Sequence, residues 1–308
     1  MKNKYILRAG TLATSLALGA VLLGNTAYGS VVDLGAASGF TVLTYNSSNV
    51  SDSAFQGGGA IGVVNGNWTQ SGGQQTDTQQ ATTVDLSPGH TNGGPSVETT
   101  VFNASLLSQA WSNAQTASAN LAALTPTQTI GAITTGQTIT ESSVGNYVLS
   151  ISSINLNQAA LTLSAPAGST FVLNISGNIT LAGGSQGNGL LLAGGLTSND
   201  VVYNLTGASS SLTTSGGGNA QVIQGIVLAT GANASVNLHP GGVDGEVIAT
   251  TYTSSSGALV QGTFTTIPEA NTGYVLAPIL LGVLLLFSRN IFGMKSRRED
   301  DVLCQTTA

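Results

Sequence analysis

The sequence predicts an all-β protein, a parallel β-helix (β-solenoid) with one long α-helix packed alongside. Three observations support this fold class. Short apolar runs separated by glycine-rich corners follow one another after residue 126, and three of these runs form a loose repeat. A single long segment has helical periodicity instead. An N-terminal signal helix and a C-terminal transmembrane helix are expected in addition.

The strand-like runs in the second half are 147–151, 161–163 and 171–175, and they alternate or are continuously apolar. Residues 172–177, 202–207 and 226–231 repeat a pattern that ends in glycine, namely Gly177, Gly207 and Gly231. Because these glycines are 30 and 24 residues apart, we expect coils of one type with insertions rather than a strict array. Short strands of this kind also suit a β-sandwich, which remains the alternative fold.

Each repeat continues to a leucine, and aligning Leu181, Leu212 and Leu238 predicts which side chains point outward. The residues before these leucines form one expected outward column, Thr180, Ser211 and Asn237. This column is polar but is not a regular threonine array. Ordinary solvated strand faces are therefore the simpler interpretation of this column.

The helix is predicted between residues 103 and 124. Its apolar residues recur every three or four positions, as on one face of a helix: Leu107, Ala110, Trp111, Ala114, Ala117, Leu121 and Leu124. Asn103 or Ser105 can cap its start, and Thr125-Pro126 ends it. A helix beside the strands favours the solenoid over the sandwich.

The region before the helix is less regular. Residues 39–44 and 60–64 resemble strands, whereas residues 69–100 contain few large apolar side chains. We therefore expect a long loop, or an irregular excursion over the surface, between residues 69 and 100.

Basic residues occur only near the two ends of the chain. Between Ala9 and Ser288 there is no lysine or arginine, and residues 30–272 carry ten acids, a formal charge of −10 with both histidines neutral. A surface of one sign repels polyanions, so direct binding of nucleic acid is not expected. The only cysteine is Cys304, so no disulfide is expected in residues 30–265.

The first 29 residues have the layout of a secretory signal peptide. Lys2, Lys4 and Arg8 precede an apolar run, and small residues stand before the expected cleavage site between Gly29 and Ser30. An uncleaved N-terminal anchor is the alternative. We expect residues 30–265 to form the exported β-helix ectodomain.

The C-terminal segment is predicted to be a second membrane element. Residues 266–273 form a linker, residues 274–294 a transmembrane helix, and residues 295–308 a cytoplasmic tail. The positive cluster consists of Arg289, Lys295, Arg297 and Arg298, which would hold the tail inside the cell. A buried core helix is the alternative for this segment.

The same tail resembles a PEP-CTERM sorting signal. Pro268-Glu269-Ala270, an apolar helix and a basic cluster follow one another as in that family. The resemblance implies processing by an exosortase-like enzyme and release to the envelope surface or the extracellular matrix. Ala270 stands where a second proline is usual, and the tail continues to Cys304 and beyond.

The exported region also resembles a known family. Residues 33–40, 53–60 and 242–249, with an alanine-rich helix between them, resemble the choice-of-anchor A family and ice-binding-like adhesive domains. The resemblance implies a parallel β-helix with one helix along its side and an adhesive role. It also implies that residues 242–249 form a closing coil.

Candidate chemical sites are few. His90 and His239 lie in expected turns, and Asp85 is near His90, but no nucleophile elbow or cationic group accompanies them. Asp244 and Glu246 are weak calcium candidates, because two carboxylates fall short of the six to eight oxygens that calcium takes. We expect no catalytic residue, no cofactor and no resident metal.

Together these observations predict an exported adhesin-like binding or structural protein of the cell envelope or matrix. Its extracellular ligand is open: a glycan, a matrix protein, a second copy or ice. An ice-binding protein of the same fold is the alternative, and a polysaccharide-active enzyme is a distant third. Because no lysine protects its sheet edges, the domain can also associate with other copies edge to edge.

Overall fold

The computed structural model of the chain describes residues 32–51, 54–56, 60–71, 83–86, 88–89, 91, 99–183, 187–216, 221–255 and 258–261. Contacts divide the chain into two units, Met1–Phe264 and Thr265–Ala308, and every described residue lies in the first. The predicted signal, linker, transmembrane and tail segments lie outside the described residues. Within the described part, no helix is long and apolar enough to cross a membrane.

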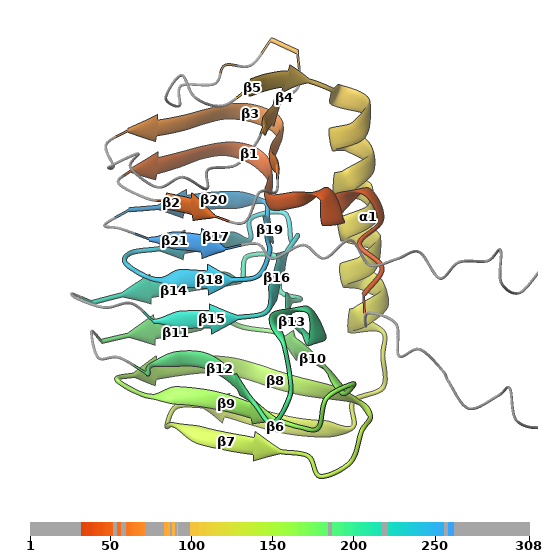
Figure 1. Cartoon of the computed structure of the whole chain (residues 1–308), viewed down its shortest axis with the longest axis vertical. Helices are drawn as coiled ribbons and strands as arrows, with labels where there is room; N and C mark the ends of the chain where they lie inside the picture. Colours follow the sequence, from red (N-terminus) through yellow and green to blue (C-terminus); the bar gives the residue numbers. More distant parts are fainter. Residues whose placement is uncertain are drawn as a thin grey trace, which may run out of the picture. The chain divides into compact units, whose positions relative to one another are not determined.

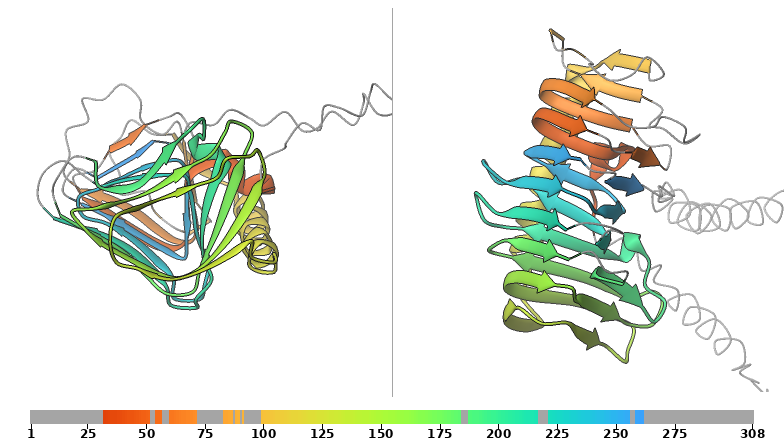
Figure 2. Two further views of the ribbon diagram at one scale, coloured as in Figure 1. Left: turned by 90° about the horizontal axis from the view of Figure 1, so that it is seen from below. Right: turned by 90° about the vertical axis from the view of Figure 1, so that its left-hand side faces the viewer.

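The described unit is a parallel β-solenoid whose strands form three faces around a core (Figures 1 and 2). Its strands belong to one 14-stranded and one 7-stranded sheet, and the strands that pair all run parallel. The fold class expected from the sequence is therefore confirmed for this unit.

Face a carries the helix on its outer side. Its strands, in stacking order, are β5 (Thr99–Phe102), β4 (Thr83–Leu86), the first half of β3 (Ala60–Ser71), the first half of β1 (Phe40–Ser51), β19 (Val247–Ala249), β16 (Ile226–Ala229), β13 (Val201–Leu205), β10 (Thr170–Ile175), the first half of β8 (Asn146–Asn157) and β6 (Gln128–Ile133).

Faces b and c complete the coils. Face b contains the second halves of β3 and β1, then β20 (Thr251–Ser254), β17 (Ser235–Leu238), β14 (Ser211–Ser215), β11 (Ile179–Ala182) and the second half of β8. Face c contains β2 (Ala54–Gln56), β21 (Leu259–Gln261), β18 (Gly242–Asp244), β15 (Val222–Gln224), β12 (Gly189–Ala193), β9 (Ala160–Ser164) and β7 (Gln137–Thr140).

The coils do not stack in the order of the sequence. The chain first builds the coils of β1 to β5 in one direction, then returns along the stack as helix α1 (Ala104–Ala122), and restarts at β6 and β7 (Figure 1). Its last coil consequently pairs with its first, β19 and β20 with β1, and β21 with β2. We call these pairings the seam. The expected closing coil, residues 242–249, thus lies inside the stack.

The expectation of a long loop between residues 69 and 100 is wrong in part. β3 continues to Ser71, and β4 and β5 extend face a beyond it. These strands are short, and only a few residues of each contact the rest of the sheet. Their apolar pattern is therefore too brief to be distinguished from a loop in the sequence.

The repeat found in the sequence corresponds to the register of face a. Val172 lies beside Val202, and Val202 lies beside Ile226. The glycines that end these strands are required by close packing between coils. A Cβ atom added to Gly177, Gly207 or Gly231 would lie 2.5–2.6 Å from a carbonyl oxygen of the preceding coil, closer than a real Cβ approaches.

Two hydrophobic clusters stabilise the unit. The first fills the inside of the solenoid, and Leu149, Leu173 and Val227 on face a are fully buried in it. The second lies between face a and the segment made of α1 and the 3₁₀ helix η1 (Gly35–Gly39). Successive strand residues point to opposite sides, so face a contributes alternately to both clusters. This accounts for its almost continuously apolar sequence.

Helix α1 is fixed to face a by hydrogen bonds as well as by apolar contacts. Asn103 caps its start by accepting a hydrogen bond from the Leu106 N–H at 3.1 Å. Near its other end, the Asn204 side chain accepts a 2.6 Å hydrogen bond from the Ser118 hydroxyl and donates to the Ser118 carbonyl and to Asn174. Asn174 donates to the Leu121 carbonyl at 2.7 Å. These buried amides set the position of the helix along the stack.

Candidate binding face

A ladder of threonine and asparagine side chains runs along the outside of face b. Its members lie side by side on successive strands, with buried residues on either side of most of them in the sequence. In stacking order the ladder consists of Asn155, Thr180, Thr213, Asn237, Thr253, Asn49 and Thr69. Neighbouring strands are about 4.8 Å apart, so the ladder is a regular row of uncharged polar groups.

The leucine alignment made from the sequence is wrong by two residues at one coil. Leu212 lies beside Ile179, and Thr180 lies beside Thr213. Ser211 belongs to a neighbouring outward column with Ser235 and Thr251. The two coils differ in length, so Leu212 does not occupy the position equivalent to Leu181. Only the register of the strands reveals this shift.

Sequence analysis found two members of the ladder, Thr180 and Asn237, and missed the others. Asn49 and Thr69 lie next to Thr253 only because the two halves of the chain meet at the seam. No repeat relates these segments in the sequence. Asn155 could have been found, because Leu156 on its strand lies beside Leu181.

The three faces differ in what they expose. Face a is covered by α1 and η1. Face c exposes a mixture of side chains, including Val222, which is 37% exposed, and Asp244. The described strand residues of face b include no charged side chain. Face b is therefore both uncovered and neutral within the described part of the solenoid.

The catalytic candidates do not come together. His90 lies outside the described residues. Asp85 is on β4, and His239 follows β17; β20, β1 and β3 stand between those strands in the sheet order. Burial raises the pKa of Asp85 above its ordinary value. Asp85 and His239 therefore do not belong to one Ser-His-Asp arrangement.

The two calcium candidates have different environments. Asp244 is partly exposed on β18, whereas Glu246 is only 6% exposed at the corner before β19. Burial raises the pKa of Glu246 well above its ordinary value, and its Oε2 has no hydrogen-bond partner among the described residues. No group of three or more histidine, cysteine, aspartate or glutamate residues in the described ranges could hold a metal ion.

The other predicted site residues lie outside the described part of the chain. They are the cleavage pair Gly29 and Ser30, the sorting motif Pro268, Glu269 and Ala270, and the basic cluster Arg289, Lys295, Arg297 and Arg298. Their roles remain predictions.

Comparison with known families gives one match that covers most of the chain. The family described as "Putative Ice-binding-like adhesive domain" matches residues 12–260. No curated protein matches the chain in sequence.

Solved structures with the same fold come from several cold-environment organisms. An ice-binding protein from the Antarctic ascomycete Antarctomyces psychrotrophicus is 20% identical, with a TM-score of 0.55 over 76% of this chain and 99% of that one. An ice-binding protein from an Arctic yeast is 24% identical, with a TM-score of 0.55 over 78% and 97%. The ice-binding protein 1 domain of Shewanella frigidimarina is 17% identical, with a TM-score of 0.54 over 76% and 98%. At these identities the likeness shows the fold alone.

Proposed function

The chain belongs to the family of ice-binding-like adhesive domains, and we propose that it is an exported adhesin-like protein that binds through face b. The observation that carries this proposal is the ladder from Asn155 to Thr69, an uncharged row along the stack whose members are partly or fully exposed. The described strands of the other two faces offer no comparable surface, since one is covered by the helix and the other carries Asp244 and exposed Val222. The family is described as adhesive, and the structures similar in fold are named as ice-binding proteins, which supports a role in binding.

The proposal includes export and anchoring by the tail. Lys2, Lys4 and Arg8 with the apolar run behind them support secretion, and the basic cluster from Arg289 to Arg298 supports a cytoplasmic tail. Pro268-Glu269-Ala270 supports sorting by an exosortase-like enzyme. Mass spectrometry of the mature protein from a host with such an enzyme should find no peptide from residues 274–287. Recovery of that peptide in the mature protein would contradict the processing step.

Ice binding is the second candidate. It is favoured by the regular spacing of the Thr and Asn side chains on face b and by the names of the proteins that share the fold. Against it, asparagine and threonine alternate irregularly along the ladder, so the face presents no uniform threonine array.

One pair of variants tests whether face b is the binding surface. Thr213→Tyr places a bulky ring in the ladder, and Thr162→Tyr places the same ring on an outward position of face c. Cells that display the full chain should bind glycan-coated, matrix-coated or self-coated surfaces about tenfold less well with Thr213→Tyr, equivalent to about 1.4 kcal/mol. Thr162→Tyr should bind like the unmodified chain. Equal binding by both variants would remove face b from the proposal.

The same variants decide between adhesion and ice binding. Thermal hysteresis measured on the full chain should be absent if the function is adhesion to a surface other than ice. Thermal hysteresis that Thr213→Tyr abolishes and Thr162→Tyr preserves would instead establish ice binding by face b.

A further inference from the structure

A hollow of about 320 Å³ interrupts the outer surface where face b ends. Its lining mixes polar and apolar surface and contains no carboxylate, lysine or arginine, and its residues come from three neighbouring strands and from corners that follow them. Its polar side chains include those of Asn49, Asn237, His239, Thr253 and Ser255.

The hollow is built at the seam between the two halves of the chain. Asn237 on β17 lies beside Thr253 on β20, and Thr253 lies beside Asn49 on β1. β20 and β1 meet only because the last coil pairs with the first. The hollow is therefore complete only when the seam is formed.

The polar groups of the hollow are held in place by hydrogen bonds. The Thr253 hydroxyl donates to Asn237 Oδ1 at 2.6 Å, and Asn237 Nδ2 donates to the Ser235 hydroxyl at 3.1 Å. His239 Nδ1 contacts the Ser255 hydroxyl, and the His239 backbone N–H donates to the Thr214 hydroxyl at 2.7 Å. Such fixed side chains lose little freedom when a ligand binds.

Donors and acceptors remain for a ligand in this arrangement. An asparagine amide has two N–H groups and two acceptor lone pairs, so Asn237 keeps one N–H and one lone pair after its two hydrogen bonds. The exposed Asn49 side chain makes no hydrogen bond to the described residues. The hollow thus offers both donors and acceptors across adjacent strands, about 4.8 Å apart.

The charges in and around the hollow favour a neutral ligand. The hollow is lined by no carboxylate, so a cation finds no charged ligand in it, and the net negative charge of residues 30–272 repels an anion. An apolar ligand would leave the amides and hydroxyls without partners. A compound with several hydroxyl groups can donate to and accept from all of them.

From this geometry we propose that the hollow binds a neutral saccharide, such as the uncharged end of a surface glycan. The inference rests on the proposed binding function and names its ligand class. It places the saccharide contacts on Asn49, Asn237 and Thr253, with the His239 and Ser255 corner as the wall of the site.

The test is a titration of the full chain, held in a detergent whose headgroup is not a sugar, with glucose, galactose, mannose and N-acetylglucosamine. At least one should bind, with a Kd of about 1 mM, as isothermal calorimetry or ligand-observed NMR measures it. Asn237→Ala and Thr253→Val should each weaken binding about tenfold or more. Glucuronate, which carries a negative charge, should bind more weakly than glucose.

Thr162→Val is the matched control, because Thr162 lies at an outward position of face c, away from the ladder and outside the hollow. It should bind the saccharide like the unmodified chain, and the melting temperature of each variant checks its folding. Absence of binding for all four sugars at about 50 mM, well above the Kd proposed here, overturns the inference. Equal losses for Thr162→Val and the hollow variants overturn it as well. If sugars fail to bind while Thr213→Tyr still weakens adhesion, the proposed function stands and only this site is rejected.

Discussion

The two halves of the solenoid are held together in different ways. In the C-terminal half, from β6 to β21, most coils stack on the coil that precedes them in the chain, and all three faces have paired strands. In the N-terminal half, β3, β4 and β5 extend face a, but the described strands of face c end at β2. The N-terminal half therefore depends on the seam and on α1, both of which join it to distant parts of the chain.

The comparison shows where a repeat can be recognised in a sequence. A coil that packs on its sequence neighbour repeats that neighbour's spacing, as 172–177 and 202–207 do. A coil that packs across the seam has no such constraint, because its partner lies at the other end of the region. The N-terminal half thus has the same fold without a visible repeat.

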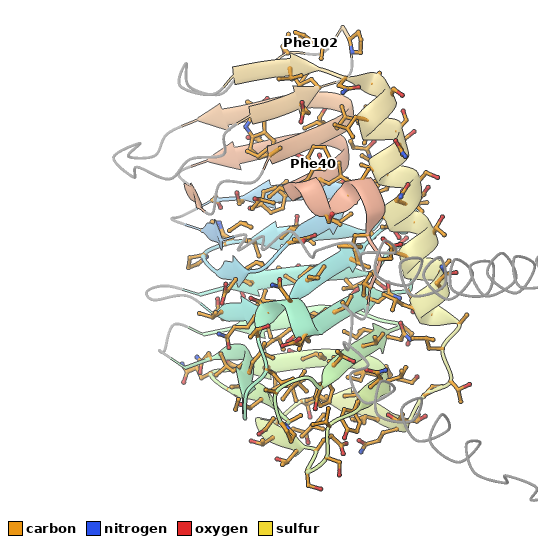
Figure 3. The ribbon with its side chains drawn as sticks, turned by 45° about the vertical axis from the view of Figure 1, so that its right-hand side comes forward. Phe40 and Phe102 are labelled. Atoms are coloured by element: carbon orange, nitrogen blue, oxygen red, sulfur yellow. The ribbon has the colours of Figure 1, made fainter. Side chains whose placement is uncertain are left out.

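The largest expected effect on stability is the difference between a substitution in a strand of the seam and one at the free end of the stack. Phe40 starts β1 next to η1 and is 2% exposed, whereas Phe102 ends the terminal strand β5 and is 57% exposed (Figure 3). Phe40→Ala should lower the free energy of unfolding by about 3–5 kcal/mol, since it leaves a cavity in a buried cluster. Phe102→Ala should lower it by less than about 1 kcal/mol. Denaturant unfolding of both variants measures the difference, and similar losses would contradict the importance given to the seam.

A smaller loss of stability is expected from a substitution where the C-terminal half contacts helix α1. Asn204→Ala removes the hydrogen bonds to Ser118 and Asn174 and leaves buried groups without partners, so the free energy of unfolding should fall by about 2–4 kcal/mol. Asn155→Ala changes an exposed asparagine in the same half and serves as the control, with a change of less than about 0.5 kcal/mol. A loss no larger than that of the control would show that apolar contacts alone position α1.

The smallest effect concerns Glu246, one residue before the strand that pairs with β1 at the seam. Its raised pKa means that the folded protein retains a proton that the unfolded chain releases above about pH 4.5. Its contribution to stability is therefore complete below that pH and is lost as the pH rises toward the pKa of the folded state. Glu246→Gln should flatten this decline in the free energy of unfolding, measured by denaturant at several pH values.

Asp85 provides the comparison for that experiment, because burial raises its pKa as well and it lies on β4, away from the seam. Asp85→Asn should remove a separate part of the pH dependence. If Glu246→Gln leaves the pH profile unchanged, the carboxyl group of Glu246 is solvated in the folded protein.

The sequence by itself determined the local features: the solenoid class, the helix near 103–124, a cap at Asn103 or Ser105, and the register of face a between Val172, Val202 and Ile226. The structure selects Asn103 as the cap. The local features follow from short-range periodicity and from glycines that neighbouring coils require. Only the tertiary structure decided the seam, the strands β4 and β5, and the ladder from Asn155 to Thr69. The reason is physical. Parallel strands can pair whatever their separation along the chain, so strands that pair across the seam need not share a sequence repeat. The hollow at Asn49, Asn237 and Thr253 exists because of that long-range pairing.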